Sequence, residues 1–303
     1  MNNSAGINHA AWLFFFRVNV AAIALLHFLA IQPDFADLYS YAGYIYPDIM
    51  DLSTDQVSLT LVRLQEWLQL QHMGVSYETL VWICRIAYPV SLVCLLLGLL
   101  TRVNALIALF LQLLLIKSIH LYEYGVDGYT TFALFYCCIF PVGRAYSLDN
   151  RWRRRTATPN ATAFLFLLRA HLSIAYFFSG FDKIIGPTWR NGEALWKALH
   201  SHNYYSMFNL DFLAGTPFFL VSGWLTVALE MGYIAGMNNP YTRKYWLAGI
   251  VALHLFIAMF MGLFFFSALL IVLNLSAYLA PYVRQEKLPA ENQPNTFLRN
   301  ASI

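Results

Sequence analysis

Three polar residues recur along one apolar segment at a spacing that could support proton-transfer chemistry. Arg169, Tyr176 and Lys183 follow one another at intervals of seven residues, so a helix places them on one face, about 21 Å from first to last at ~1.5 Å rise per residue. A lysine acts as a base only where its surroundings favour the uncharged amine. It can also extend to the lipid headgroups beside an interfacial tyrosine. The spacing alone leaves both interpretations open.

Other ionisable residues interrupt the apolar segments. A charge at the centre of a membrane helix costs about 2.5 to 3.5 kcal/mol on insertion scales, so such residues usually pair or line a water-filled cavity. We expect Glu230 to be the counter-ion of Arg17 or Arg169, because these three lie toward one end of their spans and Lys183 toward the other. The remaining residues of this kind are His27, Arg85, Lys117, His120, Asp127, His171, Asp182 and His254.

The composition indicates the medium in which these residues lie. Of 303 residues, 59% are hydrophobic and 12% are charged, which does not fit a soluble domain. Since about 20 apolar residues cross a bilayer, we predict an all-α polytopic membrane protein, a bundle of about eight transmembrane helices. The predicted spans lie near residues 11–31, 79–100, 103–122, 128–142, 161–185, 216–237, 244–261 and 264–283. The last two share one long apolar stretch, which must reverse near Met261 and Gly262.

The distribution of lysine and arginine predicts the orientation. Eleven of these residues fall on one side of the predicted spans and three on the other, and the positive-inside rule places the richer side in the cytoplasm. Both termini are then cytoplasmic in a plasma (inner) membrane. Segments 32–78 and 186–215 face outward and are amphipathic or aromatic, with an interfacial helix over Val57 to Leu70. Residues 1–284 form one membrane domain, and 285–303 form a disordered cytoplasmic tail.

The same features exclude several classes of function. The net charge of +3 is dispersed between apolar runs, which argues against a nucleic-acid partner. All four cysteines lie inside apolar runs without metal-ligand spacing, so we expect neither a metal site nor a disulfide scaffold. The adjacent Cys137 and Cys138 are interpreted as packing residues.

The segment from Leu168 to Lys183, together with Gly186 to Gly192, resembles the central signature of the HTTM family, the membrane region related to vitamin K-dependent gamma-carboxylase. The loop from Pro141 to Asp149 and the later His254 agree with that family in order. The resemblance covers about residues 105–275. The signature positions matched are Leu168, Arg169, Tyr176, Phe177, Gly180, Lys183, Trp189 and Gly192.

This resemblance implies roles for individual residues. In the carboxylases the lysine matched by Lys183 is the base that deprotonates reduced vitamin K, so the implied cofactor is a reduced quinone. The implied catalytic residues are Lys183 and His254, with His254 binding a quinone oxygen or polarising a carbonyl; a satisfied core histidine is the equal alternative. The implied cofactor-binding residues are Arg169, Tyr176, Trp189 and Asp127.

Three departures from the carboxylase pattern limit these implications. The chain has no room for the large luminal domain that holds a protein substrate. Val126 and Asp127 stand where the carboxylases have a histidine, and Asp182 precedes Lys183, where a carboxylate favours the charged ammonium. In length and helix plan the chain is more similar to short bacterial members such as the sporulation-delaying protein B family, which act in production of an exported antimicrobial peptide.

Two functions therefore remain. The first is a membrane enzyme that acts on a quinol or an exported peptide, with Lys183 as general base. The second is a non-enzymatic membrane partner in the maturation or export of a small peptide, bound at the outer face. Membrane lipid is an expected partner of both. An ion-coupled transporter ranks last, because the sequence offers no paired broken helices in corresponding halves.

Overall fold

The architecture is helical throughout the described part of the chain. The structure is a computed structural model and describes residues 7–152, 159–201, 207–208 and 210–282. All regular elements within these ranges are helices, which confirms the predicted all-α fold class. The tail predicted for residues 285–303 lies outside the described residues, as do Arg153, Arg154 and Arg155.

Six helices in the described ranges are long and apolar enough to cross a membrane. Two shorter helices occupy the positions of the other two predicted spans: α7, Gly125–Ile139, and α12, Phe218–Met231. A short helix, α13 (Tyr233–Asn238), continues α12 beyond Gly232. The six are α1 (His9–Ala30), α5 (Tyr77–Leu97), α6 (Thr101–Ser118), α9 (Thr162–Ile185), α14 (Arg243–Met261) and α15 (Phe264–Tyr278), whose span continues through the turn η4 to Tyr282.

The long apolar stretch reverses where the sequence predicted. α14 ends at Met261 and α15 begins at Phe264, with Gly262 between them at a φ of 68°. A residue with a Cβ adopts this left-handed conformation only at a steric cost, whereas glycine does so freely. Gly98, at a φ of 73°, ends α5 in the same way before α6.

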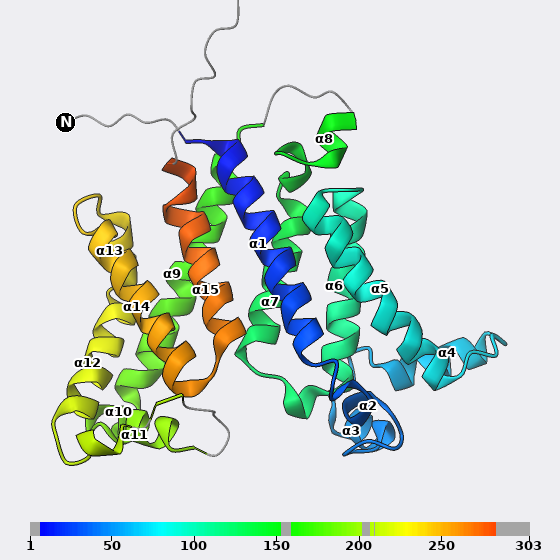
Figure 1. Cartoon of the computed structure of the whole chain (residues 1–303), viewed down its shortest axis with the longest axis horizontal. Coiled ribbons are helices and arrows are strands. Elements are labelled where there is room, and N and C mark those ends of the chain that lie inside the picture. The colour runs from blue at the N-terminus through cyan, green and yellow to red at the C-terminus, as the bar shows by residue number, and fades with distance from the viewer. Residues whose placement is uncertain (1–6, 153–158, 202–206, 209, 283–303) are drawn as a thin grey trace, which may run out of the picture.

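The bundle has two distinct ends (Figure 1). At one end, α1, α6, α9 and α14 begin, and described basic residues gather there; we call this end the arginine face, defined by Arg102, Arg144, Arg151, Arg243 and Lys244. The opposite end, the short-helix face, carries five helices that are too short to span. They are α2 (Phe35–Tyr39), α3 (Pro47–Ser53), α4 (Leu61–Leu70), α10 (Pro187–Arg190) and α11 (Glu193–Leu199).

The helices form two lobes that meet at α1 and α15 (Figure 1). The first lobe holds α1, α5, α6 and α7, and the second holds α9 and α12 to α15. α15 is the most buried of the six long helices and packs against α1 and α7 as well as against α9 and α14. A residue on α15 can therefore connect the interiors of both lobes.

One buried arginine fixes the loop at the arginine face of the first lobe. The Arg17 side chain is 1% exposed, and its guanidinium donates hydrogen bonds to three carbonyl oxygens, those of Val142 (2.8 Å), Ala145 (3.0 Å) and Tyr146 (2.8 Å). These carbonyls belong to or follow the turn η2, Val142–Arg144. The expectation that Arg17 pairs with Glu230 is therefore wrong, because backbone oxygens already occupy the guanidinium.

Replacing Arg17 by methionine should destabilise the protein by about 2–3 kcal/mol, because three buried carbonyls lose their donors in an apolar setting. Chemical unfolding in mild detergent measures the change. Arg85→Met is the matched control: Arg85 donates to the Gln32 side chain at 2.8 Å and stacks on Phe35 in a half-buried position. Its loss should cost about 1 kcal/mol or less. Equal costs for the two variants would contradict the structural role of Arg17.

Candidate functional site

The second lobe contains a cavity of about 700 Å³. Helices α9, α12, α14 and α15 line it, with contributions from α7, α10 and α11. Cavities that hold small-molecule ligands have about 300–1,000 Å³ and mostly apolar walls with a few placed polar groups. This cavity follows that pattern, with apolar lining that includes Leu195, Leu225, Leu229, Leu253, Phe256, Ile257 and Phe266.

Lys183 is the cationic group of this cavity. Its Nζ donates to Glu230 Oε2 at 2.7 Å and to Ser179 Oγ at 2.6 Å, and it lies 5.3 Å from the ring centroid of Trp189. Glu230 is 6% exposed, so the carboxylate is shielded from solvent. Lysine and glutamate therefore form a neutral pair in the cavity wall, which is how a membrane interior tolerates two ionisable groups.

The depth predicted for Glu230 is wrong, because α9 and α12 are offset along their axes. A Cβ at Gly180 would lie 2.7–2.8 Å from atoms of Met231, and one at Gly192 would lie 2.8 Å from the Leu220 nitrogen. The chain from Gly186 to Gly192 thus extends past the end of α9 before α12 begins. Glu230 consequently lies level with the last turns of α9, beside Lys183 and away from Arg169.

Asp182 has less influence on Lys183 than the sequence suggested. The Asp182 side chain is exposed and is not part of the cavity lining. Adjacent residues on a helix point about 100° apart, so only Lys183 of the two faces the cavity. The carboxylate that holds the Lys183 ammonium comes from Glu230 on another helix.

A chain of four polar side chains positions His254, which also lines the cavity. Tyr233 donates to Asn274 Oδ1 at 2.7 Å, Asn274 Nδ2 donates to the Tyr176 hydroxyl at 2.9 Å, and that hydroxyl lies 2.7 Å from His254 Nε2. Asn274 is fully buried and His254 is 3% exposed. The rings of Tyr176 and Tyr233 stack with centroids 4.4 Å apart, which keeps the chain in register.

The direction of these hydrogen bonds determines the tautomer of His254. The Tyr176 oxygen accepts from Asn274, and its own buried proton needs an acceptor, which His254 Nε2 supplies. A neutral imidazole that accepts at Nε2 carries its proton on Nδ1. His254 Nδ1 is buried and has no hydrogen-bond partner among the described residues. The His254 side chain is part of the cavity lining.

Four of the six residues predicted for the site meet at this cavity: Lys183, His254, Tyr176 and Trp189. Arg169 does not line it. Its guanidinium donates to the carbonyl of Ala277 at 2.9 Å and to the Tyr282 hydroxyl at 3.2 Å, near the arginine face. Of the three residues spaced by seven, Tyr176 and Lys183 therefore line the cavity, whereas Arg169 lies near the arginine face.

Asp127 does not line the cavity either. It is 3% exposed and accepts the Tyr124 amide at 3.0 Å, as a cap at the start of α7. Its other oxygen is 3.9 Å from His27 Nδ1. The predicted role of Asp127 in binding a cofactor therefore has no counterpart in the geometry, and helix capping accounts for its position.

Most other ionisable residues of the predicted spans have local partners. Lys117 pairs with Glu123 at 3.0 Å, His120 Nδ1 lies 2.9 Å from the Thr54 hydroxyl, and His171 Nδ1 lies 2.6 Å from the Tyr136 hydroxyl. These groups are satisfied outside the lining of the cavity. Among the described residues, no group of three or more His, Cys, Asp or Glu side chains could hold a metal ion.

Sequence reasoning missed Ser179, Asn274 and Tyr233. Ser179 is one helical turn before Lys183, so the four-residue spacing could have indicated its contact. Asn274 is the lone amide of α15, a helix otherwise almost entirely apolar, and an amide there signals an interhelical hydrogen bond. No comparable signal distinguished Tyr233 among 19 tyrosines.

At the short-helix face, His200 and Asp211 form an ion pair at the end of α11, a helix that lines the cavity. His200 Nε2 lies 2.5 Å from Asp211 Oδ1, and His200 Nδ1 lies 2.7 Å from the carbonyl oxygen of Trp196. With an oxygen at both nitrogens, the imidazolium is favoured, and the hydrogen bond to Asp211 raises the pKa of His200 above its usual value of 6.5. Leu195 and Ala198 of the same helix, α11, line the cavity.

Because the folded pKa of His200 is raised, the stability that this pair contributes is complete below about pH 6.5 and is lost as the pH rises through the folded pKa. Hydrogen exchange of residues 193–200, corrected for the intrinsic pH effect, should therefore show weaker protection at pH 8.5 than at pH 5.5. His200→Gln should abolish the difference. On the same helix, the hydrogen bond from Lys197 lowers the pKa of Glu193, so that carboxylate stays ionised across this range. Equal protection of the wild type at both values would refute the role of His200.

Comparison with known proteins leaves the site to be interpreted from its own geometry. No family model matches the chain, and no curated protein and no solved structure matches it.

Proposed function

We propose that the chain is a carboxylase-like enzyme of the plasma (inner) membrane that binds a reduced quinone in the cavity of the second lobe and removes a proton from it with Lys183. In this proposal about eight helices span the membrane, both termini are cytoplasmic and the short-helix face is outward. The observation that carries it is the Lys183–Glu230 pair at 2.7 Å in the wall of a largely apolar cavity of about 700 Å³. The motif from Leu168 to Gly192 supports the same assignment.

The cavity suits a molecule with an apolar body and a polar ring. Leucine and phenylalanine side chains offer surface to an isoprenoid-like chain, and the Trp189 ring lies near the Lys183 ammonium. Lys183 and His254 provide two polar groups on different helices, so a ring with oxygens at both ends could contact both. These are the features expected of a site for quinones.

Proton removal requires Lys183 to become an amine first. In the pair, transfer of one proton from Nζ to Glu230 gives an amine and a carboxylic acid without changing the net charge. Entry of an apolar ligand expels water and favours this uncharged form. The amine then takes the proton of a quinol hydroxyl: the O–H bond breaks, an N–H bond forms, and the resulting oxyanion is neutralised by the new ammonium.

His254 would orient the same ligand. Its Nδ1–H can donate to a quinone oxygen, and the hydrogen-bonded chain through Tyr176 and Asn274 keeps the proton on Nδ1. A fixed donor costs no reorganisation when charge develops on the oxygen. His254 thus has a binding role in the proposal, and Asn274 and Tyr176 are its positioning residues.

Lys183→Arg should abolish proton removal, because arginine keeps the charge and does not provide an accessible base. We expect quinol oxidation by dioxygen, followed by quinone absorbance in proteoliposomes, to fall about 100-fold or more relative to wild type. Lys117→Arg is the matched control, since Lys117 also pairs with a glutamate but lies outside the cavity. That variant should retain the wild-type rate.

Mass spectrometry of purified wild type should also detect co-extracted quinone. Lys183→Ala combined with Glu230→Gln should lose it while its thermal stability stays similar, since the second change removes the carboxylate that would otherwise be left buried and unpaired. A fully active Lys183→Arg variant would contradict the base role. Absence of quinone from the folded wild type, before and after addition of reduced quinone, would contradict the proposed ligand.

Asn274→Leu should weaken quinone binding by roughly fivefold, equivalent to one hydrogen bond of about 1 kcal/mol. Without the amide donor, the Tyr176 hydroxyl no longer fixes the His254 tautomer. Nitrogen-15 NMR of labelled histidine should then change from the Nδ1–H form to a mixture of the two tautomers. Tyr233→Phe is the control, because Asn274 still donates to Tyr176. An unchanged His254 signal in Asn274→Leu would contradict the positioning role.

A further inference from the structure

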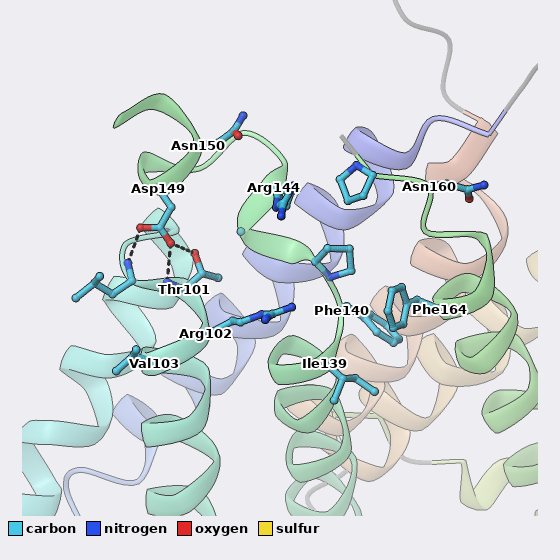
Figure 2. Close-up of a pocket in the computed structure, with 14 residues that line it drawn as sticks. Thr101, Arg102, Val103, Ile139, Phe140, Arg144, Asp149, Asn150, Asn160 and Phe164 are labelled. Atoms are coloured by element: carbon cyan, nitrogen blue, oxygen red, sulfur yellow. Dashed lines mark hydrogen bonds between the residues drawn. The ribbon is translucent and has the colours of Figure 1, made fainter. Parts of the chain in front are cut away.

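A second cavity, of about 450 Å³, lies at the arginine face of the first lobe. The start of α6, the end of α7, the start of α9 and the segment from Pro141 to Asn150, which includes η2 and the start of a short helix α8 (Leu148–Trp152), line it. Figure 2 shows Arg102 extending from α6 on one side of the cavity, Arg144 on the segment above it, and Phe140 and Phe164 next to each other. In a membrane spanned by these helices, the cavity would lie where lipid headgroups meet the acyl chains, because long helices begin or end around it.

The carboxylate in this cavity is already committed to the backbone of α6. Asp149 accepts hydrogen bonds from the amides of Leu100 and Thr101, both at 2.8 Å, and from the Thr101 hydroxyl at 2.7 Å (Figure 2). It therefore caps the first turn of α6 and fixes the loop against the helix. This arrangement holds Asp149 in place as part of the cavity wall.

Arg102 and Arg144 are the basic side chains of the lining. Both are exposed, and neither makes a side-chain hydrogen bond or an ion pair with a residue in the described ranges. The lining contains two guanidinium groups and one carboxylate, so its net charge is +1. The cavity is thus complementary in charge to a group that carries one negative charge.

The other side of the cavity is apolar. Val103, Ile139 and Phe164 come from three helices, Phe140 directly follows α7, and all four line the same space. A small inorganic anion would make no use of this wall. A ligand that combines one negative charge with a hydrocarbon chain would use both parts of the cavity.

We infer that this cavity binds the phosphodiester headgroup of an anionic phospholipid, with an acyl chain against Ile139 and Phe164. Guanidinium groups bind phosphate oxygens through paired hydrogen bonds, and the headgroup charge of −1 completes the charge of the lining. Basic pockets between membrane helices at the cytoplasmic side suit such headgroups. The site is separate from the cavity of Lys183 and does not depend on a reaction there.

Native mass spectrometry of the detergent-purified full chain tests this inference. Wild type should retain phosphatidylglycerol in preference to phosphatidylcholine, which carries the same phosphate but no net charge. Arg102→Gln combined with Arg144→Gln should reduce that preference roughly 30-fold, the equivalent of about 1 kcal/mol per arginine. The matched control is Arg151→Gln combined with Lys244→Gln, which removes two charges from the same face outside this cavity.

Three outcomes would overturn the inference. The first is equal retention of the two lipids by wild type. The second is an equal loss in the control variant, which would show a general effect of surface charge. The third is that inorganic phosphate alone stabilises the protein against heat as much as phosphatidylglycerol does, which would assign the cavity to a free anion. Thermal unfolding without lipid should be similar for all three proteins, so a loss of binding cannot reflect a loss of fold.

Discussion

A polar group inside an apolar bundle has no water molecule to bond with, so it must find its partner in the protein, and this constraint organises the interior. Arg17 binds three backbone carbonyls, Lys183 binds Glu230, and Asn274 joins two tyrosines on different helices. Each of these groups would be costly alone, so each fixes the relative position of the elements that it connects. The same interactions that satisfy the interior therefore also determine where the cavity walls lie.

The neutral pair and the hydrogen-bonded chain divide the tasks of the proposed site. Lys183 and Glu230 can exchange a proton without a change in net charge, which suits proton transfer in a medium where isolated ions are unfavourable. The chain from Tyr233 to His254 carries no charge and instead fixes the direction of one N–H group. A ligand between them would meet a proton acceptor and a preorganised donor at the same time.

The sequence was sufficient for the helical class and for the reversal at Gly262, because composition and one glycine at a tight turn carry those features. Spacing on a single helix also placed Tyr176 and Lys183 on the same face, and the motif added Trp189 and His254. What it could not provide was the offset between α9 and α12, since this depends on the close approach at Gly180 and on the path from Gly186 to Gly192. Glu230 was therefore assigned to the wrong arginines. Asp127 and Arg169 looked functional because a buried charge does not reveal whether its partner is backbone or ligand.

The short distance within the Lys183–Glu230 pair has a consequence for energised membranes. A proton that moves between these atoms travels at most 2.7 Å, about a tenth of a hydrocarbon thickness of ~30 Å. Moving a unit charge across the whole potential involves about 2.3 kcal/mol per 100 mV, so this step involves only about 0.2 kcal/mol even when it runs along the field. In the proposed function, proton exchange within the pair would thus be almost independent of the transmembrane voltage.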